Sequence, residues 1–153
     1  MKEALPFLFM LLTTMSLPMY NSHHENILQI DTIKTMKIKI TAAGKIHTAT
    51  MMDNVTTEAF MKMLPLSMKM FELNHNEKYC KLPQQLPGKA VRPGTIHAGD
   101  LMIWDGDYKS LVLFYKTFSS QYSYVKLGTV DNPDALAGAL GSGDVEVKFE
   151  KLN

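Results

Sequence analysis

The sequence has very little cysteine or arginine and no excess of charge of either sign. Its single cysteine, Cys80, excludes an internal disulfide and any metal site built from several thiolates. The 16 lysine and arginine residues nearly balance the 15 acidic residues, which leaves a formal net charge of +1. Because a protein that holds a phosphate backbone needs a basic surface, nucleic acid is not an expected partner.

Several common catalytic and metal-binding motifs are also missing. The sequence contains no nucleophile elbow, phosphate-binding loop or dinucleotide fingerprint. The stretch PGTIH, which ends at His97, is similar to a cupin turn, but cupin metal sites need H-x-H followed by Glu and His. The five histidines do not have this spacing. We therefore expect no metal, no cofactor and no catalytic residue.

The first 20 residues resemble a secretory signal peptide. Lys2 precedes an uncharged apolar run from Ala4 to Tyr20, although Glu3 weakens the basic start and no A-x-A cleavage motif follows. The run favours export to a periplasm or to the medium, with membrane contact only if it stays uncleaved. The alternative is a cytoplasmic protein that starts at Met36. In this scheme residues 1–20 are signal-like, 21–35 form a linker and 36–153 form the folded domain.

From Met36 onward, the spacing of apolar residues predicts mainly β-strands. Ile38 and Ile40 alternate with polar residues, and Gly44 supplies a turn into a second strand. Similar alternation or short apolar runs predict further strands at about 68–72, 101–104, 110–115, 123–130 and 144–150. The segment 74–79, NHNEKY, is predicted as a loop or bulge, and the proline- and glycine-rich region up to Gly94 as irregular.

Two short helices are predicted between these strands. The first follows Asp53, Asn54 or Thr56 as its N-cap and ends before Pro65, after about two and a half turns. The second begins with Asp131 or Asn132 as its N-cap, has Pro133 near its first position and ends before Gly141. Short strands, hairpins and two helices predict a closed or nearly closed antiparallel barrel, with a split β-sandwich as the alternative.

Five segments in this order resemble the bacterial cyclophilin-like family: ELNHNEKYCKLPQQLP, GTIHAGDLMIW, LVLFYKTF, YSYVKLG and ALGSGDVEVKFE. The resemblance covers Met36 to Leu152. It implies a mainly β fold, a closed eight-stranded antiparallel barrel capped by two short helices. It does not imply peptidyl-prolyl isomerase activity. Cyclophilins carry an arginine a few residues before an F-M-x-Q stretch, whereas the only arginine here, Arg92, precedes PGTIHAGD. Lys126 stands where the family often has an arginine, and a lysine cannot make the same bidentate contact.

His97 and Asp100 allow two interpretations. They could form a general base with its orienting carboxylate. The sequence favours a turn instead, because Gly99 permits a sharp bend and an aspartate readily caps nearby backbone groups. On this interpretation His97 is a residue at the rim of a pocket, or one held by a structural hydrogen bond.

The best candidate for a ligand pocket is the polar segment ELNHNEKY together with nearby tyrosines and His97. Its hydrogen-bonding groups could instead satisfy their own backbone, and the aromatic rings could be core residues. We predict a binding module for a small molecule or an extended peptide; weak peptidyl-prolyl isomerase activity is the alternative, and a purely structural role is a third possibility. The candidate ligand-binding residues are Glu72, Asn74, Tyr79, His97, Tyr115, Tyr122 and Tyr124.

Overall fold

The computed structural model describes residues 35–152. The predicted signal-like segment, 1–20, and the predicted linker up to residue 34 lie outside the described residues. Within residues 35–152, no helix is both long enough and apolar enough to span a membrane.

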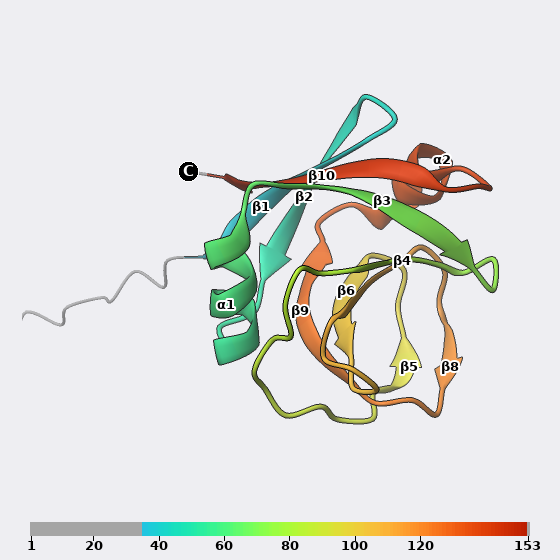
Figure 1. Ribbon diagram of the computed structural model, residues 1–153. Helices are drawn as coiled ribbons and strands as arrows, with labels where there is room; N and C mark the ends of the chain where they lie inside the picture. Colours follow the sequence, from blue (N-terminus) through green and yellow to red (C-terminus); the bar gives the residue numbers. More distant parts are fainter. Residues whose placement is uncertain (1–34, 153) are drawn as a thin grey trace, which may run out of the picture. The chain divides into compact units, whose positions relative to one another are not determined.

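Eight strands close into an antiparallel barrel in the order β1-β10-β3-β4-β7-β6-β9-β2 (Figure 1). Each strand is paired on both sides, so the barrel has no free edge. The predicted barrel is confirmed, and the sandwich alternative is excluded. The barrel strands are β1 (Lys37–Ala42), β2 (Lys45–Met51), β3 (Leu66–Leu73), β4 (Glu77–Lys81), β6 (Asp100–Trp104), β7 (Ser110–Phe114), β9 (Tyr124–Val130) and β10 (Val145–Leu152).

The prediction of a loop or bulge over 74–79 is wrong, because only its first half is a turn. Asn74 and His75 adopt φ angles of 55° and 56°, and the chain returns from this turn as β4. β4 pairs with β3 on one side and with β7 on the other. The charged pair Glu77 and Lys78 concealed this strand in the sequence, since neither residue is typical of a strand with two buried faces.

A small two-stranded sheet was not predicted. β5 (Gly94–Ile96) pairs with β8 (Phe118–Ser120) outside the barrel order. Ile96 of β5 is fully buried, so the sheet covers part of the barrel. The proline- and glycine-rich region is therefore irregular only up to residue 93, apart from an isolated bridge between Val91 and Tyr124.

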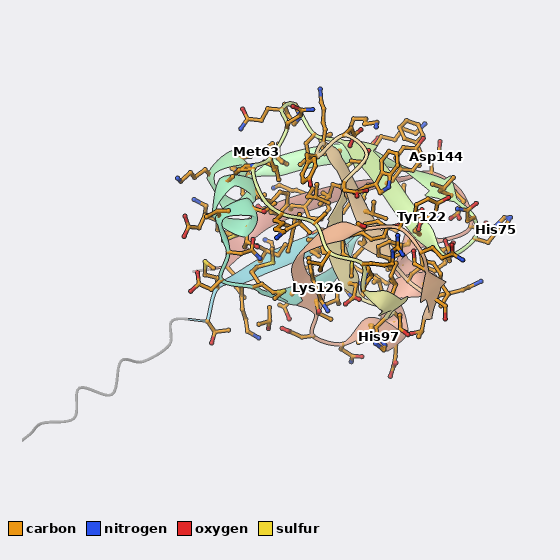
Figure 2. All side chains as sticks on the ribbon, turned by 90° about the horizontal axis from the view of Figure 1, so that it is seen from below. Met63, His75, His97, Tyr122, Lys126 and Asp144 are labelled. Carbon is orange, nitrogen blue, oxygen red and sulfur yellow. The ribbon has the colours of Figure 1, made fainter. Side chains whose placement is uncertain are left out.

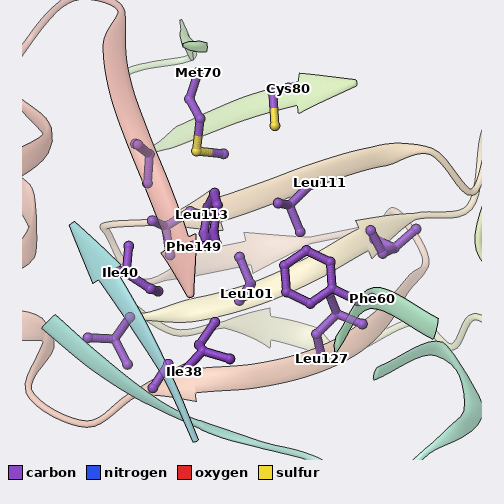
Figure 3. Packing of buried hydrophobic residues seen from close by; sticks show 14 of the residues in the cluster. Ile38, Ile40, Phe60, Met70, Cys80, Leu101, Leu111, Leu113, Leu127 and Phe149 are labelled. Atoms are coloured by element: carbon purple, nitrogen blue, oxygen red, sulfur yellow. The ribbon is translucent and has the colours of Figure 1, made fainter. Parts of the chain in front are cut away.

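The barrel interior is filled by one face of each strand. In β1 Ile38, Ile40 and Ala42 are buried while the residues between them are partly exposed. Figure 3 shows Ile38, Ile40 and Phe149 among side chains from other strands and from the first helix. Alternation at a period of two puts these residues on the same side of the pleated sheet.

The first helix, α1 (Val55–Met63), packs its buried face on this core. Phe60 meets Phe149 edge to face, with ring centroids 6.0 Å apart. Among the predicted N-caps, the structure selects Asn54, whose side chain accepts the Thr57 backbone N–H. The helix ends before Pro65, as predicted.

The second helix, α2 (Leu136–Leu140), follows a 3-10 turn, η1 (Pro133–Ala135). Leu136, Ala139 and Leu140 form its buried face, and Gly141 ends it with a φ of 65°. Asn132, one of the two predicted N-caps, is the N-cap residue of η1, but its side chain makes no capping hydrogen bond. The Asp131 carboxylate instead accepts hydrogen bonds from Lys37, Thr48 and Thr50.

Candidate functional site

The strand register separates β4 into an inner and an outer face. Lys78 lies opposite Glu72 of β3 and Leu113 of β7, while Tyr79 lies opposite Phe71 and Val112. Because side chains alternate along a strand, Lys78 and Tyr79 point to opposite sides.

The outer face carries a second hydrophobic cluster, separate from the barrel core. Ile96, Met102, Val112, Phe114 and Tyr124 are buried in it, and Tyr79, Trp104 and Phe118 pack against it. The Phe114 and Tyr124 rings meet edge to face, with centroids 5.6 Å apart. The small β5–β8 sheet contributes Ile96 and Phe118, which shows that it covers this side of the barrel.

A cavity of about 280 Å³ opens on the outer face beside this cluster. It is formed by residues from β3, the β3–β4 turn, β4, β6, β7 and the segment that enters β9. The lining residues are Leu73, Asn74, Glu77, Tyr79, Lys81, Trp104, Ser110, Val112, Tyr122 and Tyr124.

A second cavity, of about 420 Å³, adjoins the first. Both cavities are lined by Asn74, Glu77, Tyr122 and Tyr124, and residues 118–121 complete the second. Because the two cavities share these four walls, we treat them together and call them the outer groove.

Glu77 is the most unusual residue of the outer groove. It is only 7% exposed, and its carboxyl group makes no ion pair or hydrogen bond with the described residues. Burial and the nearby Glu72 carboxylate raise the pKa of Glu77 to about 7, because both disfavour its charged form. Burial and the Glu77 charge in turn raise the pKa of Tyr124 to about 12.

Lys81 also lines the outer groove, but its charge is already paired. Its ammonium group donates hydrogen bonds to Asp107 and, at 2.7 Å, to Ser110. Burial acts to raise the pKa of Asp107, but hydrogen bonds from Lys81 and from backbone N–H groups outweigh it and hold the pKa at about 2. Lys81 is therefore held toward the β6–β7 turn.

Trp104 reaches the groove from the end of β6. Its neighbour across the sheet is Tyr124 of β9. The indole ring lies against Gly106, where an added Cβ would collide with the ring. A glycine at this turn therefore lets the indole lie close to the backbone.

Of the seven predicted ligand-binding residues, four lie together. Asn74, Tyr79, Tyr122 and Tyr124 line the cavity of about 280 Å³. Asn74 occupies the β3–β4 turn, and Tyr122, which is 65% exposed, lies at the surface (Figure 2).

Glu72 and Tyr115 belong to a different cluster, on the inner face. The Tyr115 hydroxyl donates to the Glu72 carboxylate, and so does the fully buried Lys78 ammonium group. Lys78 also donates to the carbonyl oxygens of Gly141 and Gly143, at 2.9 and 2.6 Å. This network connects three parts of the chain at one end of the barrel interior.

His97 lies apart from both clusters. It is exposed, lines neither cavity of the outer groove, and is well separated from Tyr122 in Figure 2. The structure therefore does not bring Glu72, His97 and Tyr115 to the cavities that the other four candidates line. These residues were grouped by their polarity and sequence position, while strand direction and barrel closure decide where each one lies.

The sequence GTIHAGD forms the predicted turn. Gly99 has a φ of 92°, and the Asp100 carboxylate accepts the His97 backbone N–H at 3.0 Å. The same carboxylate is 1% exposed, pairs with Lys126 at 2.7 Å and accepts a hydrogen bond from Thr129. Lys126, whose side chain is 38% exposed, therefore pairs with a buried carboxylate.

No group of three or more histidine, cysteine, aspartate or glutamate side chains in residues 35–152 is placed to hold a metal ion. Cys80 is 1% exposed, and burial raises the pKa of its thiol to about 12, so the thiol is not in its reactive form near neutral pH.

Sequence comparison identifies the relatives of this chain. The model of the cyclophilin-like family matches residues 40–150, which include every residue that lines the outer groove. The chain belongs to the cyclophilin-like family. No curated protein matches it. This cyclophilin-like barrel is also similar to the solution structure of a hypothetical protein from Archaeoglobus fulgidus, with 14% sequence identity and a TM-score of 0.49 over 77% of this chain and 95% of the other.

Several residues that line the groove of this cyclophilin-like barrel, Trp104 among them, were not among the seven predicted ligand-binding residues. Glu77 lies in the polar segment ELNHNEKY, which the sequence marked as the pocket candidate, but nothing in the sequence shows that its carboxyl group has no partner. Trp104 ends an apolar run that indicates a core strand. The period of two along β4 would have placed Glu77 and Tyr79 on one face, had β4 been recognised as a strand.

Proposed function

We propose that this cyclophilin-like protein is a binding module whose ligand, a small molecule or an extended peptide, lies in the outer groove. The observation that carries the proposal is the convergence of aromatic side chains from separate strands around a cavity of about 280 Å³. Ligand sites are typically concave, largely apolar and provided with a few polar groups. Here Tyr79, Trp104 and Tyr124 supply the apolar walls, and Asn74 and Glu77 supply the polar groups.

The proposal includes the exported location that the first 20 residues favour and a bacterial source, as in the family that the sequence resembles. An exported binding module would meet its ligand outside the cytoplasm.

The proposal is tested by ligand-induced thermal stabilisation in a screen of metabolites and short peptides. Tyr79→Ala and Tyr122→Ala each remove one wall of the groove, and we expect both variants to lose the stabilisation that a ligand gives the unmodified protein. Ile46→Ala is the matched control, since Ile46 is 65% exposed on β2 and lines neither cavity of the groove. Ligands that stabilise both tyrosine variants as strongly as the control would show that the groove is not the site.

The proposal also holds that the protein is not an efficient peptidyl-prolyl isomerase. None of the described residues that line the outer groove is an arginine, and Arg92 lies elsewhere on the surface. Without a guanidinium group in the site, the electrostatic stabilisation of a twisted prolyl bond is missing. In a protease-coupled assay with an Ala-Pro peptide, we expect no rate above background at micromolar protein; a rate above background that Tyr122→Ala abolishes would contradict this.

A further inference from the structure

The charged side chains of the outer groove indicate the class of its ligand more narrowly than the shape of the groove does. Among the described residues that line its first cavity, Glu77 is the one acidic residue and Lys81 the one basic residue. The Lys81 ammonium group is engaged by Asp107 and Ser110. Glu77 is only 7% exposed and has no hydrogen-bond or ion-pair partner in residues 35–152. The cavity therefore has an uncompensated site for one positive charge.

The walls of the cavity suit the same kind of charge. Tyr79, Trp104, Tyr122 and Tyr124 line it together with Glu77. The face of an aromatic ring carries partial negative charge and attracts an ammonium group, most strongly for tryptophan. Alkylammonium ions also have apolar surface that can pack on these rings, whereas a hydrated metal ion lacks such surface. Several rings around one buried carboxylate are the arrangement expected for an organic cation.

From this geometry we propose that the ligand of the outer groove carries an alkylammonium group, which pairs with Glu77 between the aromatic walls. The inference rests on the proposed function of the same groove and names its ligand class. The ammonium group could belong to a free small amine or to the side chain of a modified lysine in a peptide. Both offer the same chemistry to the groove.

The charged and titratable groups near Glu77 determine how binding depends on pH. Glu72, from β3, repels its charge; Tyr115 and Tyr124 stay neutral near pH 7, because burial and nearby carboxylates raise the pKa of each to about 12. Lys78 points to the inner face, and Lys81 is paired with Asp107. Binding of a cation favours the charged form of Glu77, so affinity rises with pH and a proton is released on binding.

The test compares ammonium compounds with neutral compounds of the same shape, using the full chain and isothermal titration calorimetry. Choline and 3,3-dimethylbutan-1-ol represent the free amine, and a short peptide with trimethyllysine or with its neutral tert-butyl analogue represents the lysine source. We expect at least one ammonium compound to bind about tenfold more tightly than its neutral partner at pH 8. This preference should shrink at pH 5.5, and titrations between pH 6 and pH 7 in buffers of different ionisation enthalpy should show that binding releases a fraction of a proton.

Glu77→Gln is the decisive variant, with Glu58→Gln on the exposed surface of α1 as its control. The Glu77 variant should lose the preference for the ammonium compound and its pH dependence while it keeps the affinity for the neutral compound. Equal binding of charged and neutral compounds by the unmodified protein overturns the inference but leaves the groove as a binding site. Binding that survives both Tyr79→Ala and Tyr122→Ala overturns the proposed function as well.

Discussion

Two acidic residues are buried to a similar degree but meet opposite surroundings. Asp100, at 1% exposed, faces Lys126, Thr129 and a backbone N–H, so its charge is fully compensated. Glu77, at 7% exposed, has no such partner and faces a cavity. A buried charge is tolerated when it is paired and hydrogen-bonded, and otherwise the group tends to become neutral. Asp100 therefore acts within the fold, whereas Glu77 is available to a ligand.

The pH dependence of stability should reveal Glu77. Its pKa in the folded protein, about 7, is above its ordinary value of 4.5, so the folded state holds this proton more tightly than the unfolded state. Both states are protonated below pH 4.5; above it the unfolded state releases the proton first, and the contribution to stability falls until about pH 7. We expect Glu77→Gln to remove this decline and to be more stable than the unmodified protein at pH 8, by on the order of 3 kcal/mol.

Urea unfolding of the two proteins from pH 4 to pH 8 measures this difference. Parallel stability curves over the whole range would contradict the raised pKa of Glu77.

Asp100→Asn tests the structural role of the turn before β6. The amide cannot pair with Lys126 and cannot accept all the hydrogen bonds that the carboxylate accepts. We expect a loss of roughly 2–4 kcal/mol of unfolding free energy, as for other broken buried ion pairs. Urea unfolding measures this loss, and ligand binding in the outer groove should not change. A loss below about 0.5 kcal/mol, the size expected for an ordinary surface substitution, would contradict the structural role of Asp100.

Secondary-structure elements differ in how far their own sequence specifies them. α1 has a cap at Asn54 and a proline after its end, and each was readable in the sequence. β4 has no such signal, since two charged residues begin it. Its position between β3 and β7 gives Lys78 the Glu72 carboxylate as a partner, and so the sheet accommodates a residue that a strand on its own would not favour.

Asn54→Ala should destabilise α1 and its contact with β9. The Asn54 side chain accepts the Thr57 N–H at 2.9 Å and donates to the Lys126 carbonyl oxygen at 3.1 Å. We expect a loss of about 1–2 kcal/mol, the usual cost of removing an N-cap. Thermal unfolding compares this variant with Asp53→Ala, which changes the exposed neighbour that does not cap the helix. Equal stability of the two variants would contradict the assignment of the cap.

At the scale of the whole molecule, one face of the β3–β4 pair serves the barrel and the other serves the groove. On the inner face, Lys78 donates hydrogen bonds to Glu72 and to two carbonyl oxygens after α2, and the Tyr115 hydroxyl donates to Glu72. Burial acts to raise the pKa of Glu72, but hydrogen bonds from Lys78 and Tyr115 outweigh it and lower the pKa. The outer face directs Glu77 and the nearby tyrosines to the groove. The fold and the proposed binding site thus use adjacent residues of the same strand.

Lys78→Met should therefore loosen the end of the barrel near α2. The substitution removes three hydrogen bonds and leaves the Glu72 carboxylate with Tyr115 as its remaining side-chain donor among the described residues. We expect a loss of about 3 kcal/mol and faster amide hydrogen exchange from residue 141 to residue 145. Adding Glu72→Leu should recover part of the loss, because an apolar pair replaces a broken ion pair. Unchanged exchange in this segment would contradict the proposed connection.

The sequence by itself determined the strand periodicity, both helices and the turn at Gly99, because each depends on local spacing or local backbone chemistry, and it favoured a closed barrel over a sandwich. It also placed four groove residues, Asn74, Tyr79, Tyr122 and Tyr124, in one candidate set. Only the tertiary structure separated these from Glu72, Tyr115 and His97, added Trp104 to the groove and showed that Glu77 lies there without a partner among residues 35–152. The physical reason is that exposure and partner choice depend on which strands pair across the barrel. A carboxylate in a polar segment looks the same in the sequence whether it ends beside a lysine or alone at an aromatic cavity.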